Sequence, residues 1–209
     1  MRILLADDHA ILRNGLKLIL AGEFKKAEFG EAEDCRQALE AALAQSWDLV
    51  ILDISMPGRG GLDVLKELHA QRPKTPVLVL SMYSERQFAV RAFRSGASGY
   101  LTKASAGSEL IKAVERILAG GRYVSTALAE QLASELDNIG TGVLHARLSD
   151  REFEILRLIA SGKTVKEMAG ELSLSVNTIS TYRTRILEKM KMRTNAELTH
   201  YAISNKLIE

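Results

Sequence analysis

The sequence lacks the features that mark secreted and membrane proteins. Only one of its 209 residues, Cys35, is a cysteine, so no internal disulfide can form, which is typical of a reducing compartment. No apolar run approaches the ~20 residues that a helix needs to span a bilayer. The acidic residues Asp7 and Asp8 come before a signal-peptide core could form. We therefore expect a cytoplasmic protein with no membrane partner.

Neither half of the chain has a strong excess of charge of one sign. The net charge is +2, and charged residues make up 26% of the chain beside 46% hydrophobic residues, which is typical of a globular protein. Residues 1–120 carry 16 lysines and arginines against 15 acidic residues, and residues 121–209 carry 12 against 11. A nucleic-acid contact would therefore need a local basic patch.

Residues 1–119 alternate short apolar runs with amphipathic stretches. The runs are Ile3–Ala6, the weaker Ala27–Ala32, Leu49–Leu52, Val77–Leu80 and Gly99–Leu101, and the stretches between and after them are Ile11–Leu20, Arg36–Ala44, Leu62–Ala70, Arg86–Phe93 and Glu109–Leu118. Apolar strands that alternate with helices indicate a parallel sheet covered on both faces. Five such units are too few for an eight-stranded barrel, so we predict a flavodoxin-like, doubly wound (βα)5 domain over residues 1–120.

The pattern changes after Gly120-Gly121. Leucines spaced four residues apart predict a helix over Val124–Leu136, and the turn residues 138–142 predict a flexible linker, so we assign residues 121–147 to a linker region. No strand is convincing beyond Ser149. Four helix starts are predicted by the capping pairs Ser149…Glu152, Thr164…Glu167 and Thr194…Glu197 and by an N-cap at Ser175. Residues 148–209 are therefore a predicted four-helix, all-α domain.

Polar residues cluster where the predicted strands of the first domain end. Asp7, Asp8, Asp53, Ser81 and Lys103 all stand at carboxyl ends of strands, where ligand sites form in open parallel sheets. Crowded carboxylates suit Mg2+, and a carboxylate aimed at a phosphoryl donor can be a nucleophile. Any one of these residues alone would more often only cap a loop or helix. Their combination favours a phosphoryl-accepting site with Asp53 as nucleophile.

Four segments of the first domain, "LLADDH", "VILDISMPGRGGLDVL", "LVLSMYS" and "GASGYLTK", resemble the receiver domain of two-component response regulators. The resemblance implies that a sensor histidine kinase phosphorylates Asp53. It also implies a Mg2+ site formed by Asp8, Asp53 and the carbonyl of Ser55, with Asp7 assisting through water. Lys103 would contact the phosphoryl group, with Ser81 and Tyr100 as the switch pair. Ala104 departs from the family, where proline after a cis bond is common.

The second domain contains a predicted helix–turn–helix, with a first helix over Thr164–Leu172 and a second over Ser175–Lys191. On the second helix Val176, Ile179, Ile186, Leu187 and Met190 fall on one side, and Asn177, Ser180, Thr181, Thr184 and Glu188 fall on the other. A polar helix face of this kind suits the DNA major groove. A cluster of five cations follows, Arg183, Arg185, Lys189, Lys191 and Arg193, and it can neutralise phosphates.

The run "LSDREFEILRLIASGKTVKEMAGELSLSVNTISTYRTRILEKM" resembles the LuxR-type helix-turn-helix domain, so the whole chain resembles the NarL/FixJ class of response regulators. The resemblance implies a transcriptional regulator that phosphorylation shifts toward a homodimer on double-stranded promoter DNA with an inverted repeat. The expected DNA contacts are Asn177, Thr178, Ser180, Thr181, Arg183, Thr184, Arg185 and Lys189, and the expected dimer contacts are Leu198, Tyr201 and Ala202. Several relatives carry lysine at positions 180 and 184, so a larger share of phosphate and shape contacts is expected here.

Three alternatives remain open. A phosphohydrolase that turns over through an aspartyl-phosphate would carry a second acid two residues after Asp53, where Ser55 stands, so we expect a regulator and not an enzyme. A small-molecule sensor would leave Asp7, Asp8 and Lys103 without a role. A phosphorylation-independent interaction module would not need the intact set of acids, Ser81 and Lys103.

Overall fold

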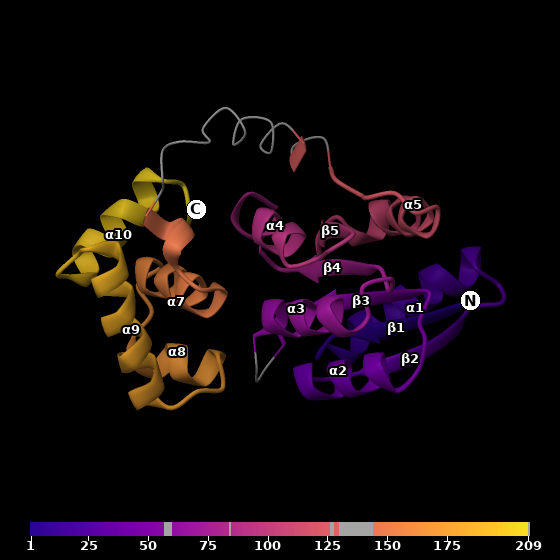
Figure 1. Cartoon of the computed structure of the whole chain (residues 1–209), viewed down its shortest axis with the longest axis horizontal. Coiled ribbons are helices and arrows are strands. Elements are labelled where there is room, and N and C mark those ends of the chain that lie inside the picture. Colours follow the sequence, from indigo (N-terminus) through magenta and orange to yellow (C-terminus); the bar gives the residue numbers. More distant parts are fainter. Residues whose placement is uncertain (57–59, 84, 126–127, 130–143, 209) are drawn as a thin grey trace. The chain divides into compact units, whose positions relative to one another are not determined.

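The computed structural model describes residues 1–56, 60–83, 85–125, 128–129 and 144–208 (Figure 1). The chain divides into two compact units, Met1–Leu132 and Ala133–Glu209. The expected linker helix over Val124–Leu136 and the expected linker at 138–142 lie largely or wholly outside the described residues, so the proposed domain boundaries stay predictions. Each unit is treated below by itself.

The first unit is built on a five-stranded parallel sheet. Its strands are β1 (Arg2–Ala6), β2 (Glu28–Ala32), β3 (Leu49–Asp53), β4 (Val77–Ser81) and β5 (Gly99–Thr102), in the order β2-β1-β3-β4-β5. The helices between and after them are α1 (Ala10–Glu23), α2 (Cys35–Ala44), α3 (Gly61–Gln71), α4 (Glu85–Arg94) and α5 (Ala106–Leu118). The predicted doubly wound arrangement of five βα units is confirmed.

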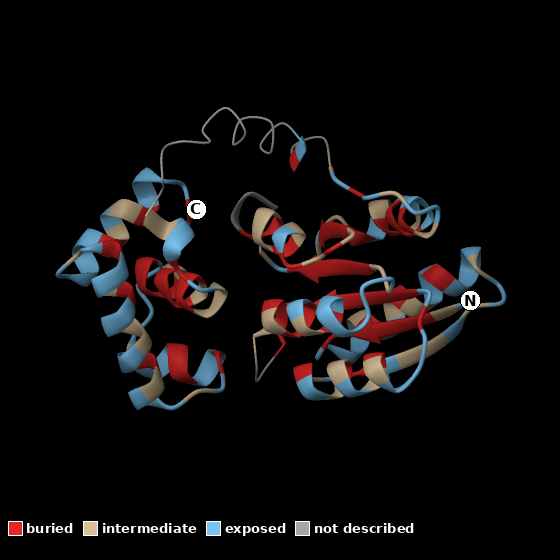
Figure 2. Ribbon diagram, viewed as in Figure 1, coloured by how far each residue is buried: buried red, intermediate tan, exposed pale blue. Residues whose placement is uncertain are grey.

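The central strands are apolar because helices cover both faces of the sheet. Every residue of β3 and β4 is buried (Figure 2). Alternate residues of each strand, such as Ile3 and Leu5 of β1, join a core with α1 and α5. Helices α2, α3 and α4 pack in sequence order on one another. The edge strand β2 is the weakest pattern in the sequence, and its Gly30 lies where a Cβ would collide with the Trp47 ring.

The second unit is helical over its described residues 144–208. A 3-10 turn η1 (Leu144–Arg147) precedes α7 (Asp150–Ala160), α8 (Val165–Glu171), α9 (Val176–Met190) and α10 (Asn195–Ser204), which confirms the predicted four helices. Ser149 and Thr164 form complete capping boxes, whereas the third is one-sided: Thr194 caps Glu197 N–H, but the Glu197 carboxylate accepts from Arg193 N–H at 2.7 Å.

The packed face of α9 is narrower than the periodicity predicts. Ile179, Ile186 and Met190 are buried, as expected, but Val176 is 49% exposed. Val176 is the first residue of the helix, after the turn in which Ser173 adopts a φ of 52°, so the neighbouring helix α8 does not cover it. The prediction that Val176 packs inward is therefore wrong.

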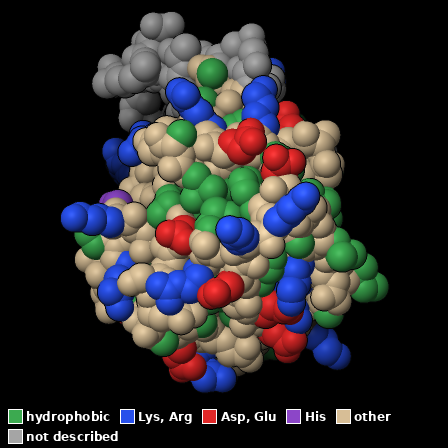
Figure 3. Space-filling model, turned by 90° about the vertical axis from the view of Figure 1, so that its right-hand side faces the viewer, with side chains coloured by type: hydrophobic (Ala, Val, Ile, Leu, Met, Phe, Trp, Pro, Cys, Tyr) green, Lys and Arg blue, Asp and Glu red, His purple; other side chains and the backbone are tan. Residues whose placement is uncertain are grey.

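On the face shown in Figure 3, acidic and basic side chains are interspersed around a group of hydrophobic ones, in keeping with a net charge of only +2. Among the described residues no helix has both the length and the apolar character needed to cross a bilayer.

Candidate functional site

Three elements of the first unit bring their carboxyl ends to one point. Asp53 is the last residue of β3, Asp7 directly follows β1, and Lys103 directly follows β5. The Lys103 ammonium lies 2.7 Å from Asp53 Oδ2 and 2.8 Å from Asp7 Oδ2. All three side chains are buried, with exposed fractions of 8%, 0% and 2% for Lys103, Asp53 and Asp7. The juxtaposition expected from the topology is therefore present.

The Asp53 carboxylate is oriented by its own loop and by Lys103. The Ser55 amide donates to Asp53 Oδ1 at 2.7 Å, which leaves Oδ2 facing the ammonium. Burial raises the pKa of Asp53, and the Lys103 ammonium and the Ser55 amide offset part of that rise. Burial also disfavours the Lys103 cation, but the two carboxylates outweigh it and raise its pKa. Lys103 therefore stays charged between the two acids at neutral pH.

Asp8 and His9 complete an acidic cluster at the mouth of the site. His9 N–H donates to Asp7 Oδ1 at 2.8 Å, and His9 Nδ1 lies 2.7 Å from Asp8 Oδ1. Candidate ligand atoms of Asp7, Asp8, His9 and Asp53 all lie within 4.8 Å of one another. Because three of the four donors are carboxylates, the residues present fit a hard divalent cation such as Mg2+. His9 was not among the residues predicted for this cluster.

The expected switch residues, Ser81 and Tyr100, are joined through Tyr83, which was not predicted to take part. The Ser81 hydroxyl accepts from Tyr83 N–H at 3.1 Å, and the Tyr100 hydroxyl donates to the Tyr83 carbonyl at 2.9 Å. Ser81 and Tyr100 are both fully buried. The Tyr83 ring stacks on Phe88 of α4 with 4.6 Å between centroids. A displacement of Ser81 would therefore act on the backbone that also holds Tyr100 and, through Phe88, on α4.

The structure defines the peptide bond that precedes Ala104, the residue that replaces the proline common in the family. No peptide bond between described residues is cis, so the bond between Lys103 and Ala104 is trans. Lys103 N–H donates to the Ser81 carbonyl at 2.7 Å, which ties the start of this loop to β4.

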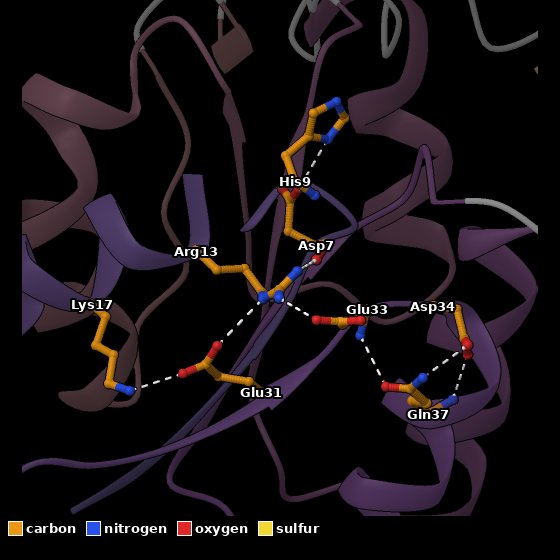
Figure 4. A network of polar contacts seen from close by, with 8 residues as sticks. All are labelled: Asp7, His9, Arg13, Lys17, Glu31, Glu33, Asp34 and Gln37. Atoms are coloured by element: carbon orange, nitrogen blue, oxygen red, sulfur yellow. Dashed lines mark hydrogen bonds and ion pairs between the residues drawn. The ribbon is translucent and has the colours of Figure 1, made fainter. Parts of the chain in front are cut away.

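A polar network behind the acidic cluster was also missed (Figure 4). The buried Arg13 of α1 donates to the main-chain carbonyl of Asp7 at 2.6 Å and to Glu33 at 2.6 Å, with Glu31 at 3.4 Å. Lys17, one turn later, binds Glu31 at 2.8 Å. The sequence does contain a signal for this network. Arg13 falls on the same face of α1 as Leu16 and Leu20, and a helix face that packs on the core is normally apolar.

The second unit exposes the helix face expected to read DNA. The residues Asn177, Ser180, Thr181 and Thr184 are exposed on α9, while Thr178 is half-buried. Three hydroxyls donate to their own helix: Ser180 to Val176, Thr181 to Asn177 and Thr184 to Ser180, at 2.9, 3.0 and 3.2 Å. A hydroxyl that already donates can still accept, so these side chains can receive base amino groups.

The cations of α9 are in different environments. Lys189 binds Oε2 of the buried Glu152 on α7 at 2.6 Å, and Arg183 donates to Asn195 of α10 at 2.8 Å. No hydrogen bond or ion pair to another described residue is found for Arg185. Arg185 instead lines an open hollow of about 340 Å3 with Asn177, Thr178, Thr181 and Tyr182. Lys189 is thus partly a structural residue, whereas Arg185 projects to solvent.

Only one of the three expected dimer residues can reach a second copy. Leu198 and Ala202 are both 0% exposed and lie in the core of the unit, on α10, which packs on α7. Tyr201 is half-buried, and its hydroxyl lies 2.9 Å from His145 Nδ1 of η1. The expectation came from the resemblance to the LuxR-type domain, whereas Leu198 and Ala202 are covered within the unit itself. Of the three, Tyr201 alone stays a proposed dimer contact.

Comparisons with known proteins identify the family of each unit. Residues 3–115 match the response regulator receiver domain family, and residues 146–202 match the family described as bacterial regulatory proteins, luxR family. The chain therefore combines a receiver domain with a LuxR-type domain. This combination defines response regulators of the DNA-binding class.

Similarity to individual proteins extends over the whole chain. It is 33% identical over 208 residues to response regulator UvrY of Escherichia coli O6:H1, covering 99% of this chain and 95% of that one. It is 35% identical over 217 residues to oxygen regulatory protein NreC of Staphylococcus epidermidis, covering 100% of both. The structure of RcsB from Salmonella enterica serovar Typhimurium, bound to promoter P1flhDC with the phosphomimetic BeF3−, matches with a TM-score of 0.60 and 27% identity over 99% of this chain and 98% of that chain.

The chain belongs to the NarL/FixJ class of two-component response regulators, with a receiver domain followed by a LuxR-type DNA-binding domain.

Proposed function

We propose that phosphorylation of Asp53 by a sensor histidine kinase controls dimerisation and promoter binding by this regulator. The observation that carries the proposal is the Lys103 ammonium held between two buried carboxylates, Asp53 and Asp7, at 2.7 and 2.8 Å. A cation so placed can follow the oxygens of an incoming phosphoryl group.

Asp53 is the nucleophile in this mechanism. Its Oδ2 attacks the phosphorus of a phosphohistidine, the phosphorus–nitrogen bond of the donor breaks, and the donor nitrogen keeps the electron pair. Asp7, Asp8, Asp53 and the Ser55 carbonyl would hold Mg2+, which when bound offsets the charge of the phosphoryl oxygens. Lys103 moves from the carboxylates to the new phosphoryl oxygens. Ser55 stands where a phosphohydrolase of this type would carry its second acid, which supports a regulator and not a turnover enzyme.

The switch pair transmits the modification. Phosphorylation adds about −1.5 to −2 charges, and Ser81 can donate its hydroxyl to a phosphoryl oxygen. If the Ser81 side chain turns toward the phosphoryl group to make this contact, its oxygen moves away from Tyr83 N–H, and the loop that also holds the Tyr100 hydroxyl rearranges. Such a group shifts the protein only by interacting differently with the two states. The surface of α4 is the proposed site of that difference.

The output is binding of double-stranded promoter DNA, with α9 in the major groove. Asn177, Thr178, Ser180, Thr181 and Thr184 are the proposed base-edge and groove contacts, and Arg183, Arg185 and Lys189 the proposed phosphate contacts. Two copies on an inverted repeat would pair near α10, with Tyr201 at the contact. A cytoplasmic location is proposed because both the phosphoryl donor of the kinase and the promoter DNA are in the cytoplasm.

The test is phosphoryl transfer from radiolabelled acetyl phosphate with Mg2+, followed by electrophoretic mobility shifts on promoter DNA. Asp53→Asn should lose the acid-labile label and the phosphorylation-dependent gain in DNA affinity. Asp48→Asn is the matched control, because Asp48 is exposed and directly precedes β3, at the end away from Asp53. Full labelling of Asp53→Asn would refute the assignment, and catalytic release of phosphate over many turnovers would favour the phosphohydrolase alternative.

A further inference from the structure

Arg13 occupies a position where stability alone favours an apolar side chain. It lies on the buried face of α1 with Leu16 and Leu20 and is only 5% exposed. An arginine is rarely so buried unless its charge is paired. It is also the fourth residue of α1, where the positive end of the helix dipole disfavours a cation. Replacing a buried ion pair by apolar residues is often neutral or stabilising.

The charge of Arg13 is balanced locally, away from the acidic cluster. Glu33 binds Nη2 at 2.6 Å and Glu31 lies 3.4 Å from Nε, while Lys17 also binds Glu31. Two cations and two anions of α1 and the β2 region thus sum to zero (Figure 4). Arg13 therefore acts on the acidic cluster mainly through geometry and little through its field.

The third guanidinium nitrogen of Arg13, Nη1, binds the backbone between Asp7 and Asp8. Arg13 Nη1 donates at 2.6 Å to the carbonyl of Asp7, which belongs to the peptide unit that joins Asp7 to Asp8. On its other side, Asp7 N–H donates to the Ala32 carbonyl of β2 at 3.1 Å. Because a peptide unit is planar, fixing its oxygen fixes the directions in which the chain leaves toward both residues. The relative placement of the Asp7 and Asp8 carboxylates therefore depends on this contact.

We propose that Arg13 is a positioning residue for the divalent-cation site: its fork, anchored by Glu31 and Glu33, holds the peptide between Asp7 and Asp8 so that the two carboxylates converge with Asp53. The proposal rests on the proposed function, since it needs the acidic cluster to bind Mg2+. It places the support of the cation site on β2 and α1, elements that supply none of the ligands themselves.

The test compares Mg2+ affinity with stability in the same variants. Arg13→Met removes the fork but keeps an apolar side chain of similar length for the packed face. We expect its Mg2+ Kd, measured by isothermal titration calorimetry, to rise about tenfold, the usual loss when a group that orients metal ligands is removed. Its unfolding free energy in the chelator EDTA, followed by Trp47 fluorescence, should be unchanged or higher. Lys17→Met is the matched control, because it removes a cation of the same network but leaves the Asp7 contact, and its Kd should stay within twofold.

The outcomes separate the two proposals. A merely structural Arg13 would give Arg13→Met a lower stability with a Kd within twofold of the wild type, and this result overturns the inference. If Arg13→Met does not fold, Arg13→Gln decides in the same way, because glutamine cannot hold Asp7 and Glu33 together. Absence of Mg2+ binding by the wild-type protein would instead refute the cation site itself. A Kd raised equally by Lys17→Met would also overturn the inference, since the effect would then follow charge and not the peptide contact.

Discussion

The two units use charged side chains in opposite ways. In the first, Lys103, Asp7 and Asp53 come from three separate elements and are at most 8% exposed. In the second unit, the cations proposed to contact DNA phosphates all lie on one helix, α9, and two of them, Arg185 and Lys189, are exposed. Buried, convergent charges define a single point where one phosphoryl group can be accepted. Exposed charges on one surface instead give an affinity for any polyanion that salt weakens.

The difference extends to what holds each set of charges. Burial is costly in the first unit and is offset by mutual pairing, so each partner depends on the others. In the second unit Arg185 projects to solvent and Arg183 donates to the uncharged Asn195, whereas the Lys189 ammonium compensates the buried Glu152. Single substitutions among the buried charges should therefore lower the stability of the first unit. Single substitutions among the exposed cations of α9 should mainly weaken DNA binding by the second unit.

Removal of Lys103 should have the largest effect. Lys103→Met leaves the carboxylates of Asp7 and Asp53 buried without a cation, so we expect a loss of about 3–5 kcal/mol in unfolding free energy without divalent cations. Urea unfolding in EDTA, followed by the fluorescence of Trp47, measures it. Added Mg2+ should recover part of the loss, because a ligand that binds only the folded state stabilises it.

The control for that experiment is Lys17→Met. Lys17 is 42% exposed and its pair with Glu31 is correspondingly screened, so its loss should stay below about 1 kcal/mol. Equal losses in the two variants would remove the contrast between buried and exposed pairs in this unit.

Glu152→Gln should have a smaller, pH-dependent effect in the second unit. Burial raises the pKa of Glu152, but the Lys189 ammonium and the Ser149 donors outweigh it, so that the pKa lies below its ordinary value of 4.5. A lowered carboxyl pKa stabilises the fold above the unfolded-state value, and that stabilisation disappears as pH falls through the folded-state value. We expect Glu152→Gln to cost about 1–2 kcal/mol at pH 7, discounted because Lys189 is 43% exposed.

Hydrogen–deuterium exchange of α7 and α9 amides measures this cost within the second unit, which contains no tryptophan. The difference between the wild type and Glu152→Gln should shrink toward zero below pH 4.5. A difference that is constant from pH 7 to pH 3.5 would show that packing, and not the ion pair, is responsible.

The order of elements and the meeting of Asp7, Asp53 and Lys103 could be predicted because they follow from general rules. Apolar runs alternating with amphipathic stretches define the sheet, and parallel strands bring their carboxyl ends to one edge. The capping pairs at Ser149 and Thr164 are local in sequence and were predicted for the same reason.

The contacts that escaped prediction depend on the packing of distant segments. The contact of Arg13 with the Asp7 carbonyl requires α1 to lie against the end of β1, and that of Lys189 with Glu152 joins residues 37 apart in the sequence. Tyr83 links Ser81 to Tyr100 through its backbone N–H and carbonyl, which carry no sequence signal. Leu198 and Ala202 were expected at a dimer contact because of the resemblance to the LuxR-type domain, and a resemblance does not show which residues of α10 the domain itself covers.

The comparison can be sharpened within α9 itself. Arg185 projects to solvent, so Arg185→Ala should leave the stability of the unit within about 0.5 kcal/mol of the wild type. If its guanidinium contacts one phosphate, binding to any DNA sequence should weaken about three- to tenfold. The slope of log K against log salt concentration should then become shallower by about 0.9.

Lys189→Gln, on the same helix, should change the slope by less than half as much, because Glu152 already engages that ammonium. Fluorescence anisotropy with a specific and a scrambled duplex, at several salt concentrations, gives both slopes. Equal slope changes would mean that Lys189 leaves Glu152 when DNA binds, and that the exposed charges of this unit act together, as the buried charges of the first unit do.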